Sequence, residues 1–301
     1  MLIGIKVDVD TERGTRFGTK NLARLFQSLS IPATFLFSLG PDNTGRALKR
    51  IFRPGFIKKV SRTNVLKIYG LKTLLNGVLW PGPFIAKRHA SLLQDIHKQG
   101  FEVGIHAFDH TYWQDSVNKL SQEKIDAEFS RAYSTFMTVF HFPAKTAGAP
   151  GWQANEKTLR AYDNKNLDYA SDCRGTHPFY PKIKDTQFNT LQIPTTLPTL
   201  DEVLGTNINE SVLVDYFINL LTPHAPNIFT IHAELEGMHY LPFLKKFIQT
   251  CLSKGFQFQT LETIAKKYLT EKNKVPICYL TQGFIEGRSG LLSLQGSEIF
   301  D

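Results

Sequence analysis

The stretch Glu102-Val103-Gly104-Ile105-His106-Ala107-Phe108-Asp109-His110 carries the strongest indication of fold and function in this sequence. Its apolar residues predict a short buried strand that ends at two histidines four positions apart. In α/β folds, the carboxyl ends of the strands carry the functional groups. Two histidines at i and i+4 of a helical turn lie on one face and can bind one cation. Because this spacing is common by chance, the alternative is a core histidine beside an unrelated surface one.

The first ten residues predict a second strand with a functional end. From Met1 to Asp10, apolar residues alternate with small or polar ones, as in a β-strand with two different faces. This alternation places Asp8 and Asp10 on the same side, at the carboxyl end of the strand. Two carboxylates this close repel each other unless a cation or a shared proton lies between them. The alternative is a solvated strand end that continues into a turn at Asp10-Thr11.

Strand and helix patterns alternate along the chain at least six times. The segment 227–234 repeats the arrangement of a buried strand that ends in a histidine, His232. Such alternation indicates parallel strands connected by helices, so we expect an α/β fold of the barrel type rather than a two-layer α+β fold. We expect one domain over residues 1–301, with a basic insertion at about 43–89 and an irregular tail from about residue 270.

Polar residues gather directly after the predicted strands. In a parallel barrel the carboxyl ends of all strands open at one mouth, so residues far apart in sequence would share one site. Each of these residues has an ordinary explanation alone, but their joint occurrence at successive strand ends is hard to attribute to chance. The candidates are Asp8, Asp10, His106, His110, Asp172, Arg174, His232 and Glu234.

The net charge of +8 is concentrated in one segment. Residues 43–94 contain eleven Lys or Arg and no Asp or Glu, with Phe, Leu and Trp among the basic residues. This mixture favours an anionic membrane surface as a partner, since interfacial segments combine basic and apolar side chains. A solvated basic face on packed helices is the simplest alternative. Nucleic acid is not expected, because no groove-reading motif accompanies the charge.

Composition also indicates a compartment. No segment has eighteen uninterrupted apolar residues, so we expect no membrane-spanning helix. The N-terminus lacks the basic, apolar and cleavage regions of a signal peptide. Three widely spaced cysteines fit a reducing compartment better than a disulfide framework. We therefore expect a cytoplasmic protein that binds peripherally to the inner face of the cytoplasmic membrane.

In their order along the chain, Asp8-Val9-Asp10, His106-x-x-x-His110 and Ile231-His232 resemble the motifs of the polysaccharide deacetylase family. The resemblance implies a distorted, incomplete (β/α) barrel and a metal-dependent amide hydrolase. Further segments resemble the branch of this family that removes the formyl group from 4-deoxy-4-formamido-L-arabinose on undecaprenyl phosphate, for lipid A modification and polymyxin resistance. These segments are 6–16, 38–43, 104–110, 171–175, 193–199, 230–237 and 286–288.

The resemblance implies a role for each of five residues. Asp10, His106 and His110 would bind a divalent metal ion, and a carboxylate with two imidazoles suits zinc, cobalt, manganese or iron. Asp8 would be the general base that takes a proton from water. His232 would be the general acid that protonates the departing amine, without which an amine is too poor a leaving group.

The supporting residues are less clearly indicated. Asp172 would orient His232 and set its tautomer. Trp152 and Glu234 are candidates for the sugar site, although a single aromatic residue is more often part of the core. The Arg-x-Pro motif of the family, whose arginine positions the catalytic aspartate, is replaced here by Gly148-Ala149-Pro150. Arg174 is the candidate for the role of that arginine.

Two other functions stay open at this point. The chain could be an N-deacetylase for another amino sugar or a small amide, or a catalytically silent barrel that binds a sugar or a lipid. The silent barrel is disfavoured because it would have no need of the complete set Asp8, Asp10, His106, His110 and His232.

Overall fold

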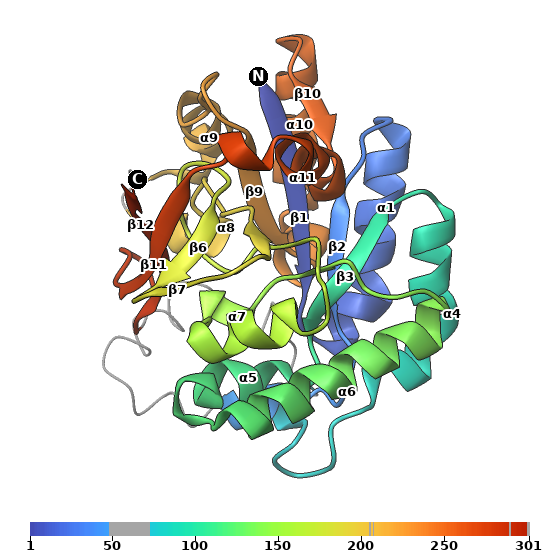
Figure 1. Cartoon of the computed structure of the whole chain (residues 1–301). Helices are drawn as coiled ribbons and strands as arrows, with labels where there is room; N and C mark the ends of the chain where they lie inside the picture. Colours follow the sequence, from blue (N-terminus) through green and yellow to red (C-terminus); the bar gives the residue numbers. More distant parts are fainter. Residues whose placement is uncertain (48–72, 205, 207, 289, 300–301) are drawn as a thin grey trace.

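The computed structural model describes residues 1–47, 73–204, 206, 208–288 and 290–299. Its centre is an eight-stranded parallel sheet that curls into an incomplete barrel, as expected (Figure 1). The order along the sheet is β10 (Gln257–Gln259), β1 (Leu2–Val9), β2 (Thr34–Ser38), β3 (Glu102–Ala107), β4 (Thr146–Ala147), β5 (Tyr169–Ala170) and β8 (Leu191–Gln192). The remaining strand, β9 (Asn227–His232), also pairs with β1.

Strand β1 lies in the middle of this sheet. It pairs with β9 over Ile3 to Asp8 and with β2 over its last residues, while β10 joins its first residues. Both faces of β1 are covered. Its odd-numbered residues Ile3, Ile5, Val7 and Val9 are fully buried in the hydrophobic core. Since side chains alternate along a strand, Gly4, Lys6 and Asp8 face the inside of the barrel.

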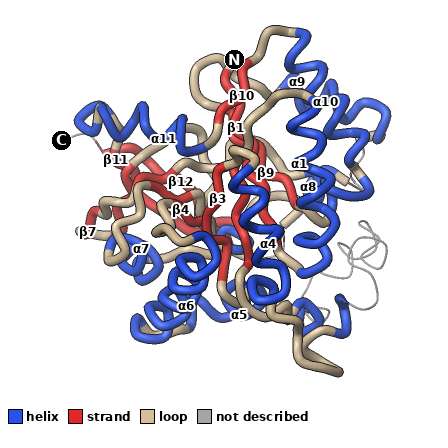
Figure 2. Tube along the Cα trace, turned by 90° about the vertical axis from the view of Figure 1, so that its right-hand side faces the viewer, coloured by secondary structure: helices blue, strands red, loops and turns tan. Residues whose placement is uncertain are grey.

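Helices pack around the outside of the sheet (Figure 2). The longer ones are α1 (Thr19–Ser28), α4 (Ile85–Lys98), α6 (Gln122–Phe140), α7 (Glu156–Asp163), α10 (Leu241–Ser253) and α11 (Leu261–Thr270). Shorter ones are α5 (His110–Ser116), α8 (Leu200–Val203) and α9 (Leu213–Asn219), with 3-10 turns at η3 (Val117–Lys119), η4 (Pro150–Trp152), η5 (Glu210–Val212) and η7 (Lys272–Lys274). Two π-helical turns, η1 (Gly14–Gly18) and η6 (Leu235–His239), follow β1 and β9.

The two ends of the sheet approach each other without forming a continuous ladder. The backbone N–H groups of Thr196 and Leu197, which follow β8, both donate to the Ile228 carbonyl of β9, at 3.1 and 3.2 Å. The Thr195 and Thr230 hydroxyls form a hydrogen bond of 2.7 Å across the same gap. These contacts close the barrel through a loop, so the strand ends share one mouth.

The expectation of an irregular tail from about residue 270 is wrong. The tail forms an antiparallel hairpin, β11 (Ile277–Gly283) and β12 (Leu292–Ile299), in a second sheet with β6 (Tyr180–Ile183) and β7 (Thr186–Gln187). In β11, Cys278 and Leu280 are buried between exposed neighbours. Two buried residues are a weak periodic signal, and it is the pairing with β6 that establishes the strand.

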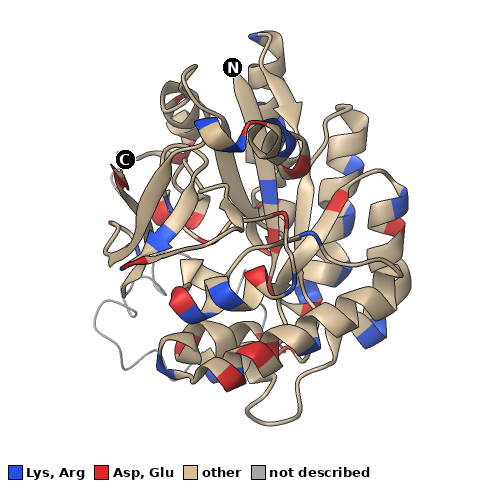
Figure 3. Cartoon of the chain, in the orientation of Figure 1, with Lys and Arg blue, Asp and Glu red and all other residues tan. Residues whose placement is uncertain are grey.

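Most of the expected basic helical insertion at 43–89 lies outside the described residues, which stop at 47 and resume at 73. After Thr73 the chain makes a turn in which Asn76 bridges to Trp80, and Val78, Leu79 and Trp80 are exposed. In the described ranges no helix is long and apolar enough to span a bilayer. Figure 3 shows Lys and Arg mainly on the outer helices, but one basic position also lies within β1, inside the sheet.

Candidate active site

Three of the expected metal ligands come together at the mouth of the barrel. Asp10 follows β1, His106 lies in β3, and His110 is the first residue of α5. Asp10 Oδ1 is 3.2 Å from His106 Nε2 and 3.4 Å from His110 Nε2. One ligand atom from each residue lies within 4.8 Å of the other two. The arrangement expected from the His-x-x-x-His spacing and from the strand β1 is therefore present.

The ring of His106 is fixed by a backbone carbonyl. Its Nδ1 lies 2.7 Å from the Gly148 carbonyl oxygen. Because a carbonyl oxygen only accepts, Nδ1 carries the proton, and in the neutral ring the lone pair of Nε2 points toward Asp10. This is the tautomer that a metal ligand needs.

The chemistry of this cluster fits a cation. Asp10 Oδ1 is buried and forms no hydrogen bond with any described residue, although it faces the two ring nitrogens. A carboxylate oxygen opposite imidazole lone pairs is unfavourable unless a proton or a metal ion lies between them. One carboxylate and two imidazoles fit a divalent transition metal, whose identity the residues leave open.

The position of His110 depends on Asp109. The Asp109 carboxylate caps α5 by accepting from the Tyr112 N–H, at 2.9 Å, and it also accepts from the Asn43 side chain, at 2.6 Å. The Asp109 N–H donates to the buried Glu128. Asp109 thus has a structural role at the turn between the two histidines.

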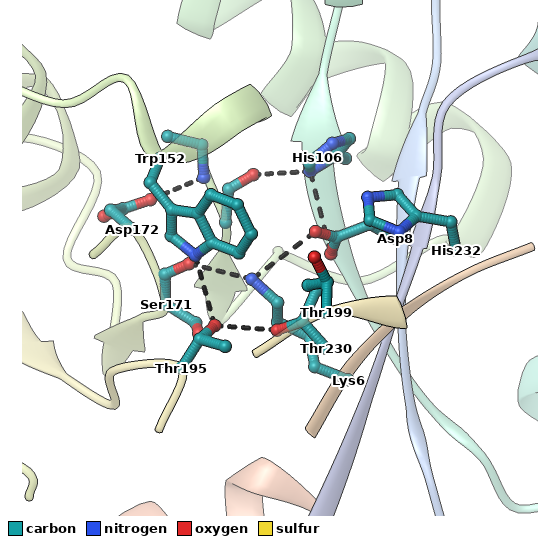
Figure 4. Close-up of polar contacts among 12 residues, drawn as sticks. Lys6, Asp8, His106, Trp152, Ser171, Asp172, Thr195, Thr199, Thr230 and His232 are labelled. Carbon is teal, nitrogen blue, oxygen red and sulfur yellow. Dashed lines mark hydrogen bonds and ion pairs between the residues drawn. The ribbon is translucent and has the colours of Figure 1, made fainter. Parts of the chain in front are cut away.

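Asp8 and His232 lie side by side on neighbouring strands. The register of β1 and β9 pairs these two residues directly, and Figure 4 shows both side chains near His106. Asp8 is 5% exposed, and within the described part of the chain its Oδ1 has no hydrogen-bond partner. The same Oδ1 is 3.9 Å from His106 Nδ1. The N–H of His232 donates to the buried Glu236, at 2.9 Å.

Asp172 supports His106 rather than His232. Asp172 Oδ1 accepts from the Ala149 N–H, at 2.6 Å, and Oδ2 accepts from Gln192. The Ala149 N–H belongs to the same peptide unit as the Gly148 carbonyl that accepts from His106. Asp172 therefore holds this peptide, and the peptide holds the ring. Among the described residues Asp172 makes no contact with His232, so the expectation that Asp172 orients His232 is wrong. Burial raises the pKa of Asp172 to about 6.

Arg174 does not take the role of the missing motif arginine. Its guanidinium donates to both carboxylate oxygens of Glu202, at 2.7 and 2.9 Å, and to the Leu197 carbonyl. Arg288, from the loop between β11 and β12, binds the same Glu202. The cation beside Asp8 is instead Lys6, 3.5 Å from Asp8 Oδ2.

Trp152 and Glu234, the candidates for the sugar site, are both buried. Trp152 is 3% exposed and donates from Nε1 to the Thr195 hydroxyl, at 3.1 Å. Arg288 lies over its ring, 4.6 Å from the centroid. Glu234 is 1% exposed, and its Oε1 accepts from the N–H groups of Asp10 and Thr11 and from the Thr11 hydroxyl. In this arrangement Glu234 holds the turn that presents Asp10.

Several residues of the site were not predicted from the sequence. Lys6 occupies the same alternate positions of the strand pattern as Asp8 and Asp10, so the sequence does indicate that it lies on their side of the strand. No sequence signal indicated the Gly148 carbonyl or the Glu236 carboxylate, because a hydrogen bond between residues far apart in sequence leaves no local pattern. Burial raises the pKa of Glu236 to about 8.

Comparisons with known proteins agree with this geometry. A family model described as polysaccharide deacetylase matches residues 10–170. A relative from Shewanella sediminis (strain HAW-EB3) is 35% identical over 99% of this chain and 95% of its own length. A relative from Wigglesworthia glossinidia brevipalpis is also 35% identical, over 94% of this chain and 98% of its own length. Both are described as probable 4-deoxy-4-formamido-L-arabinose-phosphoundecaprenol deformylases.

The chain belongs to the polysaccharide deacetylase family. A probable polysaccharide deacetylase from Pseudomonas aeruginosa PAO1 has the same fold, with a TM-score of 0.62 at 15% identity, covering 90% of this chain and 91% of that one. As a member of this family, the protein is a hydrolase that acts on amide C–N bonds. The family uses a divalent metal, and the cluster of Asp10, His106 and His110 is a fitting site for one.

Proposed function

We propose that this protein hydrolyses the formamide of 4-deoxy-4-formamido-L-arabinose carried on undecaprenyl phosphate. The products are formate and the free amino-sugar lipid, which would serve lipid A modification and polymyxin resistance. The observation that carries this proposal is the 35% identity, over nearly the full length, with two proteins described as deformylases for this substrate. The meeting of Asp8, His232 and the metal cluster at one mouth supports amide hydrolysis.

The reaction is divided between the metal site and two side chains on neighbouring strands, Asp8 and His232. A divalent metal bound by Asp10, His106 and His110 would polarise the formyl oxygen and acidify water. Asp8 takes the proton of the attacking water as the new C–O bond forms. His232, opposite Asp8 in register, gives its proton to the amine nitrogen as the C–N bond breaks. Proton uptake and proton delivery thereby fall to separate side chains.

The test is release of formate from the lipid-linked formamido sugar by metal-loaded protein, with the acetamido analogue assayed in parallel. We expect formate from the first lipid and much less acetate from the second. The control is Asp8→Asn, which should lose about 10²–10⁴-fold in kcat while it binds metal normally. Equal rates on both lipids would indicate a broader N-deacetylase, and absence of both products would indicate a silent barrel.

We also propose that the mouth works against the cytoplasmic face of the membrane, where a lipid-linked sugar would be presented. The basic residues between 43 and 94 support this, and so does the exposed apolar turn of Val78, Leu79 and Trp80, which are 53%, 66% and 42% exposed. Sedimentation with vesicles containing anionic lipid tests the proposal. We expect binding that weakens at higher salt and in the Leu79→Asp variant. Absence of binding at low salt would instead indicate that the segment is a solvated basic face.

A further inference from the structure

One buried charge beside the site is not used by the proposed mechanism. Lys6 is fully buried, in the part of β1 that pairs with β2 and β9. Burying an ammonium group without partners costs several kcal/mol, so such lysines are rare unless they are paired and hydrogen-bonded. A leucine or isoleucine would pack in a barrel interior without this cost. The position therefore suggests a function for the charge.

The contacts of Lys6 show what the charge does. Its Nζ lies 3.5 Å from Asp8 Oδ2 and donates to the Ser171 carbonyl, at 3.1 Å (Figure 4). The same Nζ lies over the Trp152 ring, 5.7 Å from its centroid. A carbonyl on one side and an aromatic face on the other fix the ammonium group in place. Lys6 is therefore a rigid partner for one oxygen of Asp8.

The two oxygens of Asp8 consequently have different surroundings. Oδ2 faces Lys6, whereas Oδ1 accepts no hydrogen bond from the residues that the structure describes and lies on the side of His106. A base must present one oxygen to the reacting water within about 3 Å. We propose that Lys6 is the positioning residue of Asp8: it holds Oδ2 so that Oδ1 faces His106, one of the candidate metal ligands. The inference rests on the proposed role of Asp8 as the general base.

Kinetics on the formamido lipid provide the first test. Lys6→Met keeps the length of the side chain but removes its charge, and we expect it to lower kcat by about 10²-fold with little change in KM. Lys6→Arg restores a cation and should recover most of the lost kcat. The matched control is Arg174→Met, another buried cation near Trp152 that pairs with Glu202 instead of Asp8. It should leave kcat per folded molecule nearly unchanged.

A second measurement does not depend on activity. Unfolding midpoints of metal-free wild type, Lys6→Met, Asp8→Asn and the double variant form a double-mutant cycle. If Lys6 holds Asp8, the drop in Tm caused by Lys6→Met should shrink by about half or more once Asp8 is neutral. The double variant places a methionine at position 6 beside an amide at position 8 and leaves no unpaired buried charge. It should therefore fold even if Lys6→Met alone does not.

The outcomes separate this inference from the proposed function. Additive changes in Tm, a rise in KM alone, or a Lys6→Arg variant as slow as Lys6→Met would each overturn the role of Lys6. If wild type releases no formate, the proposed function fails, and the cycle still decides whether Lys6 holds Asp8.

Discussion

At the scale of single residues, the two aspartates that end β1 have different surroundings. Asp10 faces the ring nitrogens of His106 and His110, whereas Asp8 faces Lys6 and lies opposite His232. Burial would raise the pKa of Asp10, but its interactions with His110 and His106 outweigh this effect and hold that pKa well below its usual value. Asp10 is thus suited to bind a cation.

His232→Ala tests the separation of base and acid. His232 is not one of the three residues whose ligand atoms cluster, so the variant should bind metal as wild type does. Without the acid the amine leaves poorly, and kcat should fall by about 10²–10⁴-fold. Steady-state rates together with metal content by atomic absorption check this. Loss of metal from His232→Ala would contradict the assignment of His232 as the acid.

Asp172 provides a second test at this scale. Removing its carboxylate in Asp172→Ala frees the peptide whose carbonyl fixes His106, so metal affinity should fall by about 10–100-fold. Asp172→Asn is the matched control, because its amide oxygen still accepts from the Ala149 N–H. Competition with a chromophoric chelator measures both. Equal affinity of the alanine variant and wild type would exclude the connection through this peptide.

At the scale of elements, the parallel strands separate two polar clusters. The carboxyl ends hold the site, while the opposite end of β3 begins with Glu102, which accepts from the Thr34 hydroxyl, at 2.5 Å, and from the Tyr169 hydroxyl. The Glu262 N–H at the start of α11 donates to the same carboxylate, at 2.9 Å. Glu102 thereby joins β2, β3, β5 and α11 below the barrel.

The buried carboxyl group of Glu102 should make the stability of the protein depend on pH. Burial raises its pKa from 4.5 to about 7, so the folded state keeps a proton that the unfolded chain has lost. Its contribution to stability is therefore full below pH 4.5 and is lost as the pH rises to about 7. Urea unfolding between about pH 5 and 7.5 should show a decline in wild type that is weaker in Glu102→Gln. The exposed Glu271→Gln is the control; identical slopes in all three proteins would contradict the prediction.

At the scale of the whole molecule, the C-terminal hairpin completes the rim of the mouth. It places Arg288 against Glu202, at 2.7 Å, and against Asp201, at 3.0 Å. Burial would raise the pKa of Glu202, but Arg288 and Arg174 together hold it below its usual value. The last strands of the chain thus stabilise the loop after β8, which closes the barrel.

Arg288→Ala should therefore destabilise the whole protein. It leaves the buried Glu202 with one of its two cations, and losing a partner from a buried pair costs about 3 kcal/mol. Arg160→Ala, which breaks an exposed pair with Glu156, should cost less than about 1 kcal/mol. Urea unfolding of both variants makes the comparison. Losses of equal size would show that the hairpin does not hold the rim.

Much of this fold and site could be predicted because the signals are local. Alternation along the first ten residues gave β1 and placed Asp8 and Asp10 on one side, and the i and i+4 spacing gave His106 and His110. The C-terminal hairpin could not be predicted because β11, in which only Cys278 and Leu280 are buried, has little periodicity. The partners of Asp172 and Arg174 could not be predicted, because both residues follow a strand and the neighbouring sequence does not indicate which groups their side chains contact.

The sequence by itself determined the succession of strands and helices and which residues stand at strand ends, because those properties depend on residues only a few positions apart. Only the tertiary structure decided that Lys6 meets Asp8, that Asp172 supports His106 through one peptide, and that Arg174 turns to Glu202. Hydrogen-bond partners are chosen by the curvature of the sheet and by the need to satisfy every buried charge. Both are properties of the packed barrel and of no single segment.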